Sequence, residues 1–415
     1  MARPKKNFAP TKESPPTNPN LAFPVKQKTT VAELAMMSQD CSNLLEQIRT
    51  TIMNPLPRKD APKFNTNEVC EVLGFDRKEL KSAESSLGTN FGTLKPGENQ
   101  KTYELEEVIQ FVEMLGLGVI RPEGKNGKVI AIASYKGGVG KTTSSITIAQ
   151  GMTLRGLKVL LIDLDAQGSA THMMGISPEL EVDEEATVMP YFYGDQENLL
   201  YAPLKTYWHN LDLIPAASCL LGVEYQFAAD LAADPTIPFW TFLNKGLEPL
   251  REYYDAIVLD CPPSLSFITQ NAMFAADGIL APCPTQSLDF ASLSQFWQVY
   301  LETSRKPEEH RSYEDDESVL LKEFDFVEVF INKGAPEKDE RAAIVKQWLK
   351  KAYKDHLCDI QIPYSVAAEK ANTEFKTIYE IGKKDVSPVA YKRYKVPIDA
   401  LVNHVCAELS ISWGR

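Results

Sequence analysis

The strongest structural signal in this chain is a glycine-rich decapeptide, Ser134-Tyr135-Lys136-Gly137-Gly138-Val139-Gly140-Lys141-Thr142-Thr143. An apolar run, residues 129–133, precedes it, and residues 144–149 continue with helix-compatible sequence. The backbone N–H groups of such a turn and of a following helix point at one spot, where the helix dipole also favours an anion. The stretch therefore predicts a strand, a phosphate-binding loop and a helix.

Two residues of this loop have distinct expected roles. Lys141 would reach the β- and γ-phosphates of a nucleotide, and the Thr142 hydroxyl would bind Mg²⁺. The general pattern G-x-x-x-x-G-K-[ST] has a glycine where this chain has Tyr135, and a second lysine, Lys136, lies inside the loop. The expected nucleotide-binding residues of the loop are Lys136, Gly137, Gly138, Val139, Gly140, Lys141, Thr142 and Thr143.

Carboxylates follow two other apolar runs. Asp163 and Asp165 come at the end of the run that starts at Val159, and their spacing of two puts both on one face of a strand. Asp260 ends the run that starts at Ala256 and precedes two prolines. Buried carboxylates are costly without a cation, so we expect Mg²⁺ or water beside the pair Asp163 and Asp165, and Mg²⁺ held through water at Asp260.

These motifs resemble those of the ParA/MinD/NifH family of ATPases. KGGVGKTT resembles its deviant Walker A box, residues 163–167 resemble its DLDPQ motif with Ala166 in place of proline, and residues 260–263 resemble its DxPP box. The resemblance implies that ATP and Mg²⁺ are the cofactors. It implies that Asp165 orients or deprotonates the attacking water and that Asp163 supports the metal or the switch region. It also implies that Asp260 holds Mg²⁺ and that Lys136 reaches the phosphates of a second subunit.

Three further residues follow later strands. Gln286 and Asp289 come just after the run 278–281, where they would line the site. Asn332, after the run 327–331, is placed like the family's adenine-contacting residue, although a turn-forming asparagine explains it equally well.

Composition indicates a globular protein of two or three domains. The chain has 415 residues, 44% of them hydrophobic and 24% charged, and a net charge of −12. DNA binding would therefore require local basic patches. We see no signal peptide and no apolar run long enough to span a bilayer. The seven cysteines form no C-x-x-C pair, which favours reduced thiols in a cytoplasm, and the five isolated histidines suggest no metal site.

Four parts are expected along the chain. Residues 1–29, rich in proline and lysine, predict a flexible tail that either contacts DNA or only solubilises the protein. Residues 30–53 predict an amphipathic helix that begins at a capping box, Thr30 to Glu33, and packs on a second subunit or on its own chain. Residues 64–120 predict a small separate domain, and residues 129–415 the ATPase domain.

The small domain has the layout of a winged helix-turn-helix. Residues 65–68 and 76–79 each open a helix, Gly74 lies between them, and the segment 88–103 suits a β-hairpin wing. A helix with basic residues early in it would contact DNA through Arg77, Lys78 and Lys81. A small helical domain that binds protein is the alternative. The unit also resembles the domain that precedes the ATPase in longer plasmid partition ATPases.

From residue 129 onward, strands alternate with helices. The expected strands are 129–135, 159–163, 211–214, 256–260, 278–281 and 327–331, and the acidic run 308–317 predicts a solvated loop. This alternation predicts an α/β fold, a parallel sheet with helices on both faces and its ligand at the carboxyl ends of the strands.

The C-terminal region is locally basic. Residues 362–367 and 376–380 resemble the end of partition ATPases. Such a patch grips phosphates regardless of base sequence, although ordinary solvated lysines are the alternative. The expected DNA-contacting residues here are Lys376, Lys383, Lys384, Lys392, Arg393 and Lys395. The helix expected at 398–411 lacks the flanking basic cluster of a membrane anchor.

Together these features resemble a ParA/SopA-type partition ATPase. The resemblance implies a cytoplasmic, nucleoid-associated homodimer that binds chromosomal DNA when it holds ATP, and no membrane. A ParB-like centromere-binding partner would stimulate hydrolysis, and the winged domain would bind and repress its own operator. The alternatives are a MinD-like membrane-positioning ATPase, a metabolic ATP-dependent ligase of the same fold, and a NifH-like reductase, for which Cys261 and Cys283 lack the glycine-rich surroundings.

Overall fold

The computed structural model describes residues 28–52, 59–88, 91–94, 100–309, 322–336, 338–382 and 385–415. The chain divides into two compact units, residues 1–55 and 56–415. The tail expected at 1–29 lies almost wholly outside the described residues. Among the helices of the described part, none has both the length and the apolar character needed to cross a bilayer.

The first unit contains helix α1, Val31–Ile52, close to its predicted bounds. Its predicted capping box is present: Glu33 accepts a bond from the backbone N–H of Thr30 at 2.7 Å, and the Thr30 hydroxyl accepts one from Glu33 at 3.2 Å. Leu34, Met37 and Leu44 of the predicted apolar stripe are exposed.

The second unit begins with a small helical region. Its elements are β1 (Lys63–Asn65), α2 (Thr66–Leu73), α3 (Arg77–Leu87), β2 (Thr102–Glu104) and α4 (Leu105–Met114). Both predicted helix starts carry capping boxes, at Asn65 and Asp76, and Gly74 ends α2 in the left-handed conformation with φ 71°. Strands β1 and β2 pair antiparallel, and Thr93 bridges to Thr102. Much of the expected wing, residues 89–90 and 95–99, lies outside the described residues.

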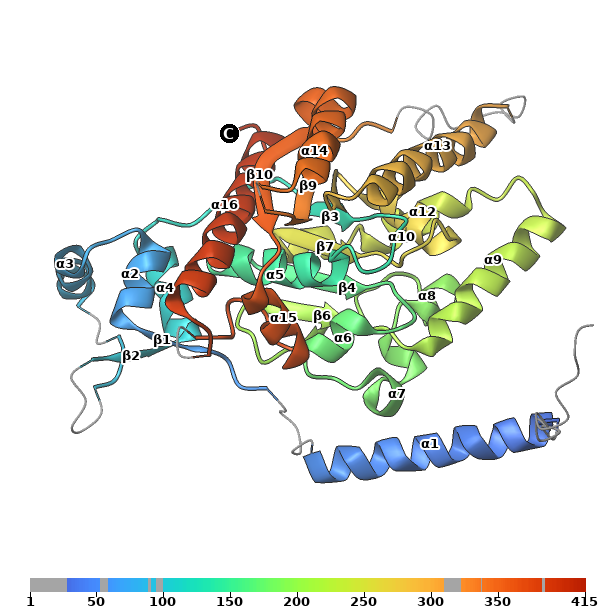
Figure 1. Ribbon diagram of the computed structural model, residues 1–415, viewed down its shortest axis with the longest axis horizontal. Helices are drawn as coiled ribbons and strands as arrows, with labels where there is room; N and C mark the ends of the chain where they lie inside the picture. The colour runs from blue at the N-terminus through green and yellow to red at the C-terminus, as the bar shows by residue number, and fades with distance from the viewer. Residues whose placement is uncertain are drawn as a thin grey trace, which may run out of the picture. The chain divides into compact units, whose positions relative to one another are not determined.

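The rest of the unit is built on an eight-stranded sheet (Figure 1). Its order is β10-β9-β8-β3-β7-β4-β6-β5, and every neighbouring pair is parallel except β5–β6. The strands are β3 (Lys128–Ile132), β4 (Val159–Asp163), β5 (Leu204–Lys205), β6 (Leu211–Ile214), β7 (Ala256–Asp260), β8 (Gly278–Cys283), β9 (Phe326–Gly334) and β10 (Leu357–Pro363). The predicted parallel α/β fold is confirmed.

Helices cover both faces of the sheet. They are α5 (Lys141–Thr153), α6 (Ser169–Met173), α7 (Pro178–Glu181), α8 (Met189–Phe192), α9 (Leu221–Ala233), α10 (Phe242–Leu247), α11 (Leu250–Tyr253), α12 (Phe267–Ala275), α13 (Ser287–Glu309), α14 (Glu340–Tyr353), α15 (Val366–Thr373) and α16 (Pro388–Ser412). One core lies under α5, α15 and α16, and the other under α9, α10, α12, α13 and α14.

The small region shares a core with the sheet. Its buried residues, among them Leu80, Tyr103 and Ile109, belong to the same apolar cluster as the residues under α5 and α16. The backbone N–H of Val119 also bonds the carbonyl of Arg155 just after α5, at 2.8 Å. The small region is therefore packed onto the ATPase body.

Several predicted element bounds were wrong. The strand expected at 129–135 ends at Ile132, where the phosphate loop takes over, and the C-terminal helix starts at Pro388 rather than residue 398. The acidic run 308–317 begins inside α13, which ends at Glu309, and residues 310–317 lie outside the described part. Strand β10 at the sheet edge was not predicted at all.

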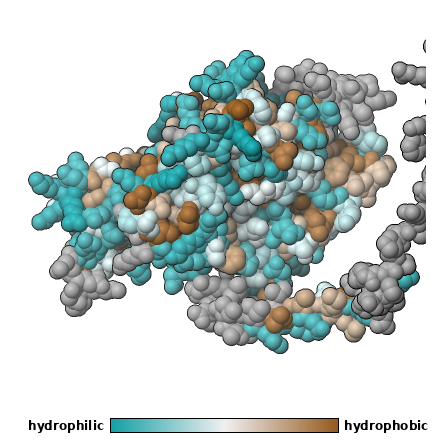
Figure 2. Space-filling model, viewed as in Figure 1, coloured by the Kyte–Doolittle hydropathy of each residue, from teal (hydrophilic) through white to brown (hydrophobic). Residues whose placement is uncertain are grey.

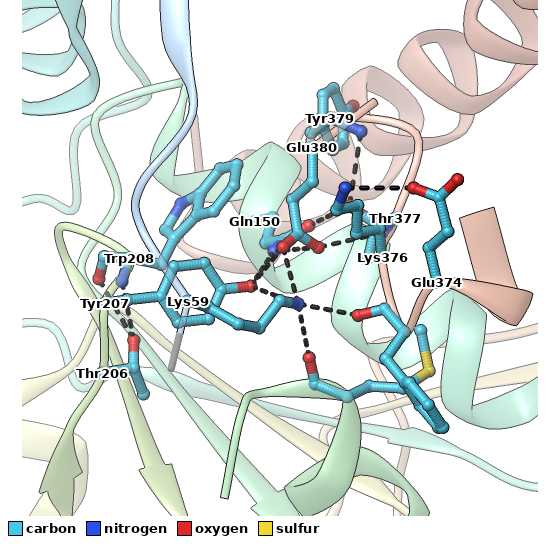
Figure 3. A network of polar contacts seen from close by, with 12 residues as sticks. Lys59, Gln150, Thr206, Tyr207, Trp208, Glu374, Lys376, Thr377, Tyr379 and Glu380 are labelled. Atoms are coloured by element: carbon cyan, nitrogen blue, oxygen red, sulfur yellow. Dashed lines mark hydrogen bonds and ion pairs between the residues drawn. The ribbon is translucent and has the colours of Figure 1, made fainter. Parts of the chain in front are cut away.

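Lys59 connects distant parts of this unit (Figure 3). Its ammonium donates to the carbonyls of Met173 at 2.7 Å and Phe375 at 2.8 Å and to the Tyr207 hydroxyl at 3.1 Å. It also lies 2.6 Å from a carboxylate oxygen of Glu380. Burial lowers the pKa of Lys59, and the charge of Glu380 opposes that shift.

Glu380 extends the same network to the C-terminal half of α5. It accepts bonds from the Tyr207 hydroxyl at 2.7 Å and from the Thr377 backbone at 2.9 Å. Gln150 of α5 donates to it at 3.4 Å and accepts from the Thr377 hydroxyl at 2.5 Å. Residues just before β1 are thus linked to the helix that follows the phosphate loop.

Candidate nucleotide-binding site

The site lies at the carboxyl ends of β3, β4 and β7, which are neighbours in the sheet (Figure 1). The loop between β3 and α5 carries Gly138 and Gly140 with φ of 75° and 93°. A side chain is strained at such angles, and a Cβ on Gly140 would also lie 2.3 Å from the amide nitrogen of Asn332. Helix α5 begins at Lys141, so its N-terminus opens on the loop as predicted.

Lys141 is buried against the loop. Only 6% of the residue is exposed, and its ammonium donates to the carbonyl of Lys136 at 2.9 Å. Burial lowers the pKa of Lys141, and the nearby carboxylate of Asp260 opposes that shift. The ammonium therefore lies between the loop backbone and an acidic residue at the end of a neighbouring strand.

The two strand-end aspartates lie side by side. Asp163 of β4 is directly opposite Asp260 of β7, and both are fully buried. Burial raises the pKa of both carboxyl groups, and the charge of Asp163 raises that of Asp260 further. A cation beside the pair would relieve this cost.

The two carboxylates differ in how their oxygens are used. Asp163 accepts from the Thr171 backbone at 2.8 Å, the Thr171 hydroxyl at 2.7 Å and the Asp165 backbone at 3.1 Å. One Asp260 oxygen accepts from the Ser145 hydroxyl at 2.8 Å, whereas the other is buried with no protein partner. Asp163 thus anchors the segment after β4, and the free oxygen of Asp260 fits a metal or its water ligand.

Thr142 belongs to the same cluster. Its hydroxyl interacts with the Asp260 carboxyl group and lowers the pKa of that group, which favours the ionised form. Together these groups are oxygen ligands of the kind Mg²⁺ prefers. Asp165 is half-buried and accepts from the Gln167 backbone at 3.0 Å, so it lies at the mouth of the site rather than within the buried pair.

Lys136 is held by its own chain. Its ammonium pairs with Asp289 in the first turn of α13; the Lys136 side chain is 39% exposed and that of Asp289 only 4%. Gln286 and Asp289 were both expected to line the site, and Asp289 contacts the phosphate loop through this ion pair.

Asn332 contacts the phosphate loop. Its amide donates to the Val139 carbonyl at 2.9 Å, and the neighbouring Lys333 donates to the Gly138 carbonyl at 2.6 Å. These bonds fix the loop from the β9 side.

Sequence reasoning missed Ser145, Thr171 and Lys333. Ser145 had one usable signal: it follows Lys141 by four residues, which puts both on one side of α5. The roles of Thr171 and Lys333 depend on the fold.

The expected DNA-contacting residues lie in two places. On α3, Lys78 and Lys81 are exposed, and Arg77 donates to Asn67 at 2.9 Å. Figure 2 shows a strongly hydrophilic surface over α3.

In the C-terminal region, Lys392 and Arg393 on α16 are exposed. Lys376 pairs with Glu374 at 3.0 Å, and Lys395 pairs with Asp399 and is 15% exposed. The structure therefore does not bring Lys395 to the same open surface. Lys383 and Lys384 lie outside the described residues.

Sequence comparisons match the chain to known proteins. The family described as "AAA domain" matches residues 127–310. "Protein SopA" of Escherichia coli (strain K12) is 30% identical over 277 residues, which are 65% of this chain and 71% of that protein. "Sporulation initiation inhibitor protein Soj" of Bacillus subtilis (strain 168) is 34% identical over 253 residues, 61% of this chain and 90% of that protein.

Solved structures show the same fold. One described as "Partition Protein" has a TM-score of 0.63 at 16% identity and covers 92% of this chain and 99% of that one. An ATP complex of a Cyanothece McdA variant has a TM-score of 0.52 at 23% identity, covering 67% of this chain and 97% of that one. With its phosphate loop, its paired strand-end carboxylates and its match to SopA, the chain belongs to the ParA/SopA family of partition ATPases, P-loop enzymes that hydrolyse ATP.

Proposed function

We propose that this protein is a nucleotide-gated DNA partition protein that uses Mg²⁺ and ATP. The observation that carries the proposal is the buried oxygen of Asp260 without a protein partner, next to Thr142 and Lys141. A Mg²⁺–triphosphate would supply the cation that this oxygen lacks and the anion that Lys141 lacks. Asp165, at the mouth of the site, would orient the attacking water.

ATP would join two subunits through Lys136. The phosphate loop has two described lysines, Lys136 and Lys141. The side chain of Lys136 is partly exposed to solvent, whereas Lys141 is buried. A cation delivered across a dimer interface stabilises the charge of the transferring phosphoryl group. The exposed apolar residues of α1 would provide a second, nucleotide-independent dimer contact.

DNA would be bound in two ways. Lys392 and Arg393 are exposed neighbours on α16 and suit nonspecific contact with phosphates. The capped helices α2 and α3, with exposed Lys78 and Lys81, suit operator binding and repression of the protein's own transcription. A ParB-like partner would stimulate hydrolysis and release the dimer from nucleoid DNA.

The deciding experiment measures ATP turnover with and without nonspecific DNA. We expect DNA to change the turnover rate of the parent protein and Lys141→Ala to abolish both turnover and nucleotide binding. The variant with Lys392→Gln and Arg393→Gln should keep basal turnover, lose most nonspecific binding and show a shallower salt dependence.

Lys350→Gln with Lys351→Gln is the matched control, because both lysines are exposed on α14. If this control weakened DNA binding as much as the α16 variant, the patch assignment would be wrong. Sedimentation with anionic liposomes should show no binding; co-sedimentation would favour a membrane-positioning role.

A further inference from the structure

A cluster of three potential metal ligands lies near the edge of the sheet. Glu328 of β9, Cys358 of β10 and His404 of α16 each direct a ligand atom to one place, and these atoms lie within 4.8 Å of one another. The His404 Nε2 atom is 2.8 Å from both oxygens of Glu328. The residues are 30 and 46 positions apart in sequence, so only the fold brings them together.

This cluster is separate from the nucleotide site. Glu328 precedes Asn332 by four residues on β9, a separation of roughly 13 Å along a strand. It lies toward the beginning of the strand, whereas the phosphate loop lies at the carboxyl end. Nothing in the proposed ATPase chemistry uses Glu328, Cys358 or His404.

The surroundings are those of a partly enclosed site. Cys358 is 6% exposed, and the side chains of Glu328 and His404 are 12% and 30% exposed. Two of the three ligands lie on adjacent strands, with Cys358 in a stretch of β10 where the pairing register shifts, and the third lies on α16, which packs on β10. With three protein ligands, a four-coordinate ion here would take a water molecule as its fourth ligand.

The ligand types select the metal. One thiolate, one imidazole and one carboxylate form a mixed sulfur, nitrogen and oxygen set, which suits Zn²⁺ and not Mg²⁺ or Ca²⁺. A tetrahedral Zn²⁺ site holds its ligand atoms about 3.3–3.8 Å apart, as follows from bond lengths of about 2.0–2.3 Å. The pair Glu328–His404 would therefore have to open by roughly 0.5 Å.

We propose that Glu328, Cys358 and His404 form a Zn²⁺-binding site that fastens α16 to strands β9 and β10. Binding displaces the hydrogen bond between Glu328 and His404 and releases the proton of the Cys358 thiol, together with that of the imidazole where it is protonated. The thiolate, the carboxylate and the metal then sum to zero charge. The competing interpretation is a metal-free ion pair between Glu328 and His404, in which Cys358 also interacts with the imidazole.

The test uses the full-length protein with Co²⁺ and Zn²⁺ as probes, after treatment with a chelator and without nucleotide. A Co²⁺–thiolate bond gives a charge-transfer absorption in the near ultraviolet, which an oxygen-only site cannot give. We expect one equivalent of Co²⁺ to produce this band, Zn²⁺ to displace it, and Zn²⁺ to raise Tm by mass action.

Variants separate a metal site from an ion pair. Cys358→Ser should abolish the absorption band and the Zn²⁺-induced rise in Tm. Glu328→Gln and His404→Asn should each lower the affinity for Co²⁺ and Zn²⁺ by tenfold or more, which corresponds to about 1.4 kcal/mol. Cys219→Ser, a partly exposed cysteine elsewhere, is the control and should change neither. Absence of the band in the parent protein, or a band that survives Cys358→Ser, overturns the proposal. Because the readout is the metal-induced change, loss of stability in a variant does not obscure it.

Discussion

Gly140 faces the Asn332 amide at a backbone angle that side chains rarely adopt, and both properties disfavour a larger residue there. Gly140→Ala should therefore lose ATP binding and lower Tm. Part of the loss comes from the left-handed angle, about 1–2 kcal/mol, and the remainder from the contact with Asn332. Gly194→Ala is the matched control, because Gly194 has φ 82° and nothing within 4 Å of its Cβ position. Equal losses of Tm in the two variants would show that the Asn332 contact does not matter.

Asp260 links the site to the pH dependence of stability. Burial, and then the charge of Asp163, raise the pKa of Asp260 from the ordinary 3.8 to about 8. Between these values the folded protein keeps a proton that the unfolded chain has released, so the free energy of unfolding falls as pH rises from about 4 to about 8. Asp260→Asn removes this contribution: the variant should be more stable than the parent at pH 8 in a chelator, yet unable to hydrolyse ATP.

Urea denaturation at several pH values, without metal or nucleotide, measures this effect. Asp195→Asn serves as the control because Asp195 is exposed. A parent protein and an Asp260→Asn variant with the same pH slope would refute the assigned shift. Addition of Mg²⁺ with ATP should stabilise the parent and leave the variant unchanged.

Among individual residues, the sequence predicts the site residues that belong to a short motif with fixed spacing. Lys141, Thr142 and Asp260 were found because each stands at a fixed place after an apolar run. The Lys136–Asp289 pair could be only half anticipated, since 153 residues separate the two. The cluster of Glu328, Cys358 and His404 could not be anticipated from isolated histidines.

Among the elements, strand β10 shows where pattern reasoning stops. Its sequence, residues 357–363, alternates weakly and contains Asp359 and Gln361, whose exposure fits an edge strand. The buried strands β4 and β7 have continuous apolar runs and were predicted with their exact bounds. Capping boxes located the starts of α1, α2 and α3 equally well, because the signal lies within four residues.

The network around Lys59 permits a test of how elements are joined. Lys59→Met leaves the Glu380 carboxylate, whose side chain is 5% exposed, without its cation, and should cost about 3–5 kcal/mol. The double variant Lys59→Met with Glu380→Gln should lose less than the single variant, because no buried charge remains. Denaturation of the two single variants and the double variant gives the coupling energy.

Lys63→Met is the control for this cycle. Lys63 pairs with Glu104 at 2.7 Å, but both side chains are more than half exposed, so its loss should barely change stability. If the losses of unfolding free energy from the Lys59 and Glu380 substitutions were additive, the two side chains would have no coupling energy, and the ion pair would not join these elements.

For the molecule as a whole, we expect the ion pair between Lys136 and Asp289 to compete with the proposed contact of Lys136 across a dimer interface. In the Asp165→Ala background, where hydrolysis should be blocked, Asp289→Asn would free Lys136 and promote the ATP-dependent dimer. A partly exposed pair is worth about 0.2–1 kcal/mol, and each of the two subunits releases one pair, so the dimer dissociation constant should fall by about 2- to 30-fold. Sedimentation analysis with ATP measures this change. Lys136→Ala added to Asp289→Asn should abolish the gain; a gain that persists would exclude Lys136 as its cause.

The order in which the chain is synthesised gives the Lys59 network another meaning. Lys59 leaves the ribosome early, whereas Phe375 follows 316 residues later, and Glu380 lies beyond it. At ~5–20 residues per second this delay is about 15–60 s. During that time Lys59 lacks the Glu380 carboxylate, and the small region lacks the residues of α16 that belong to the same apolar cluster. The small region, which is made before the sheet, is thus among the last parts of this unit to be completed.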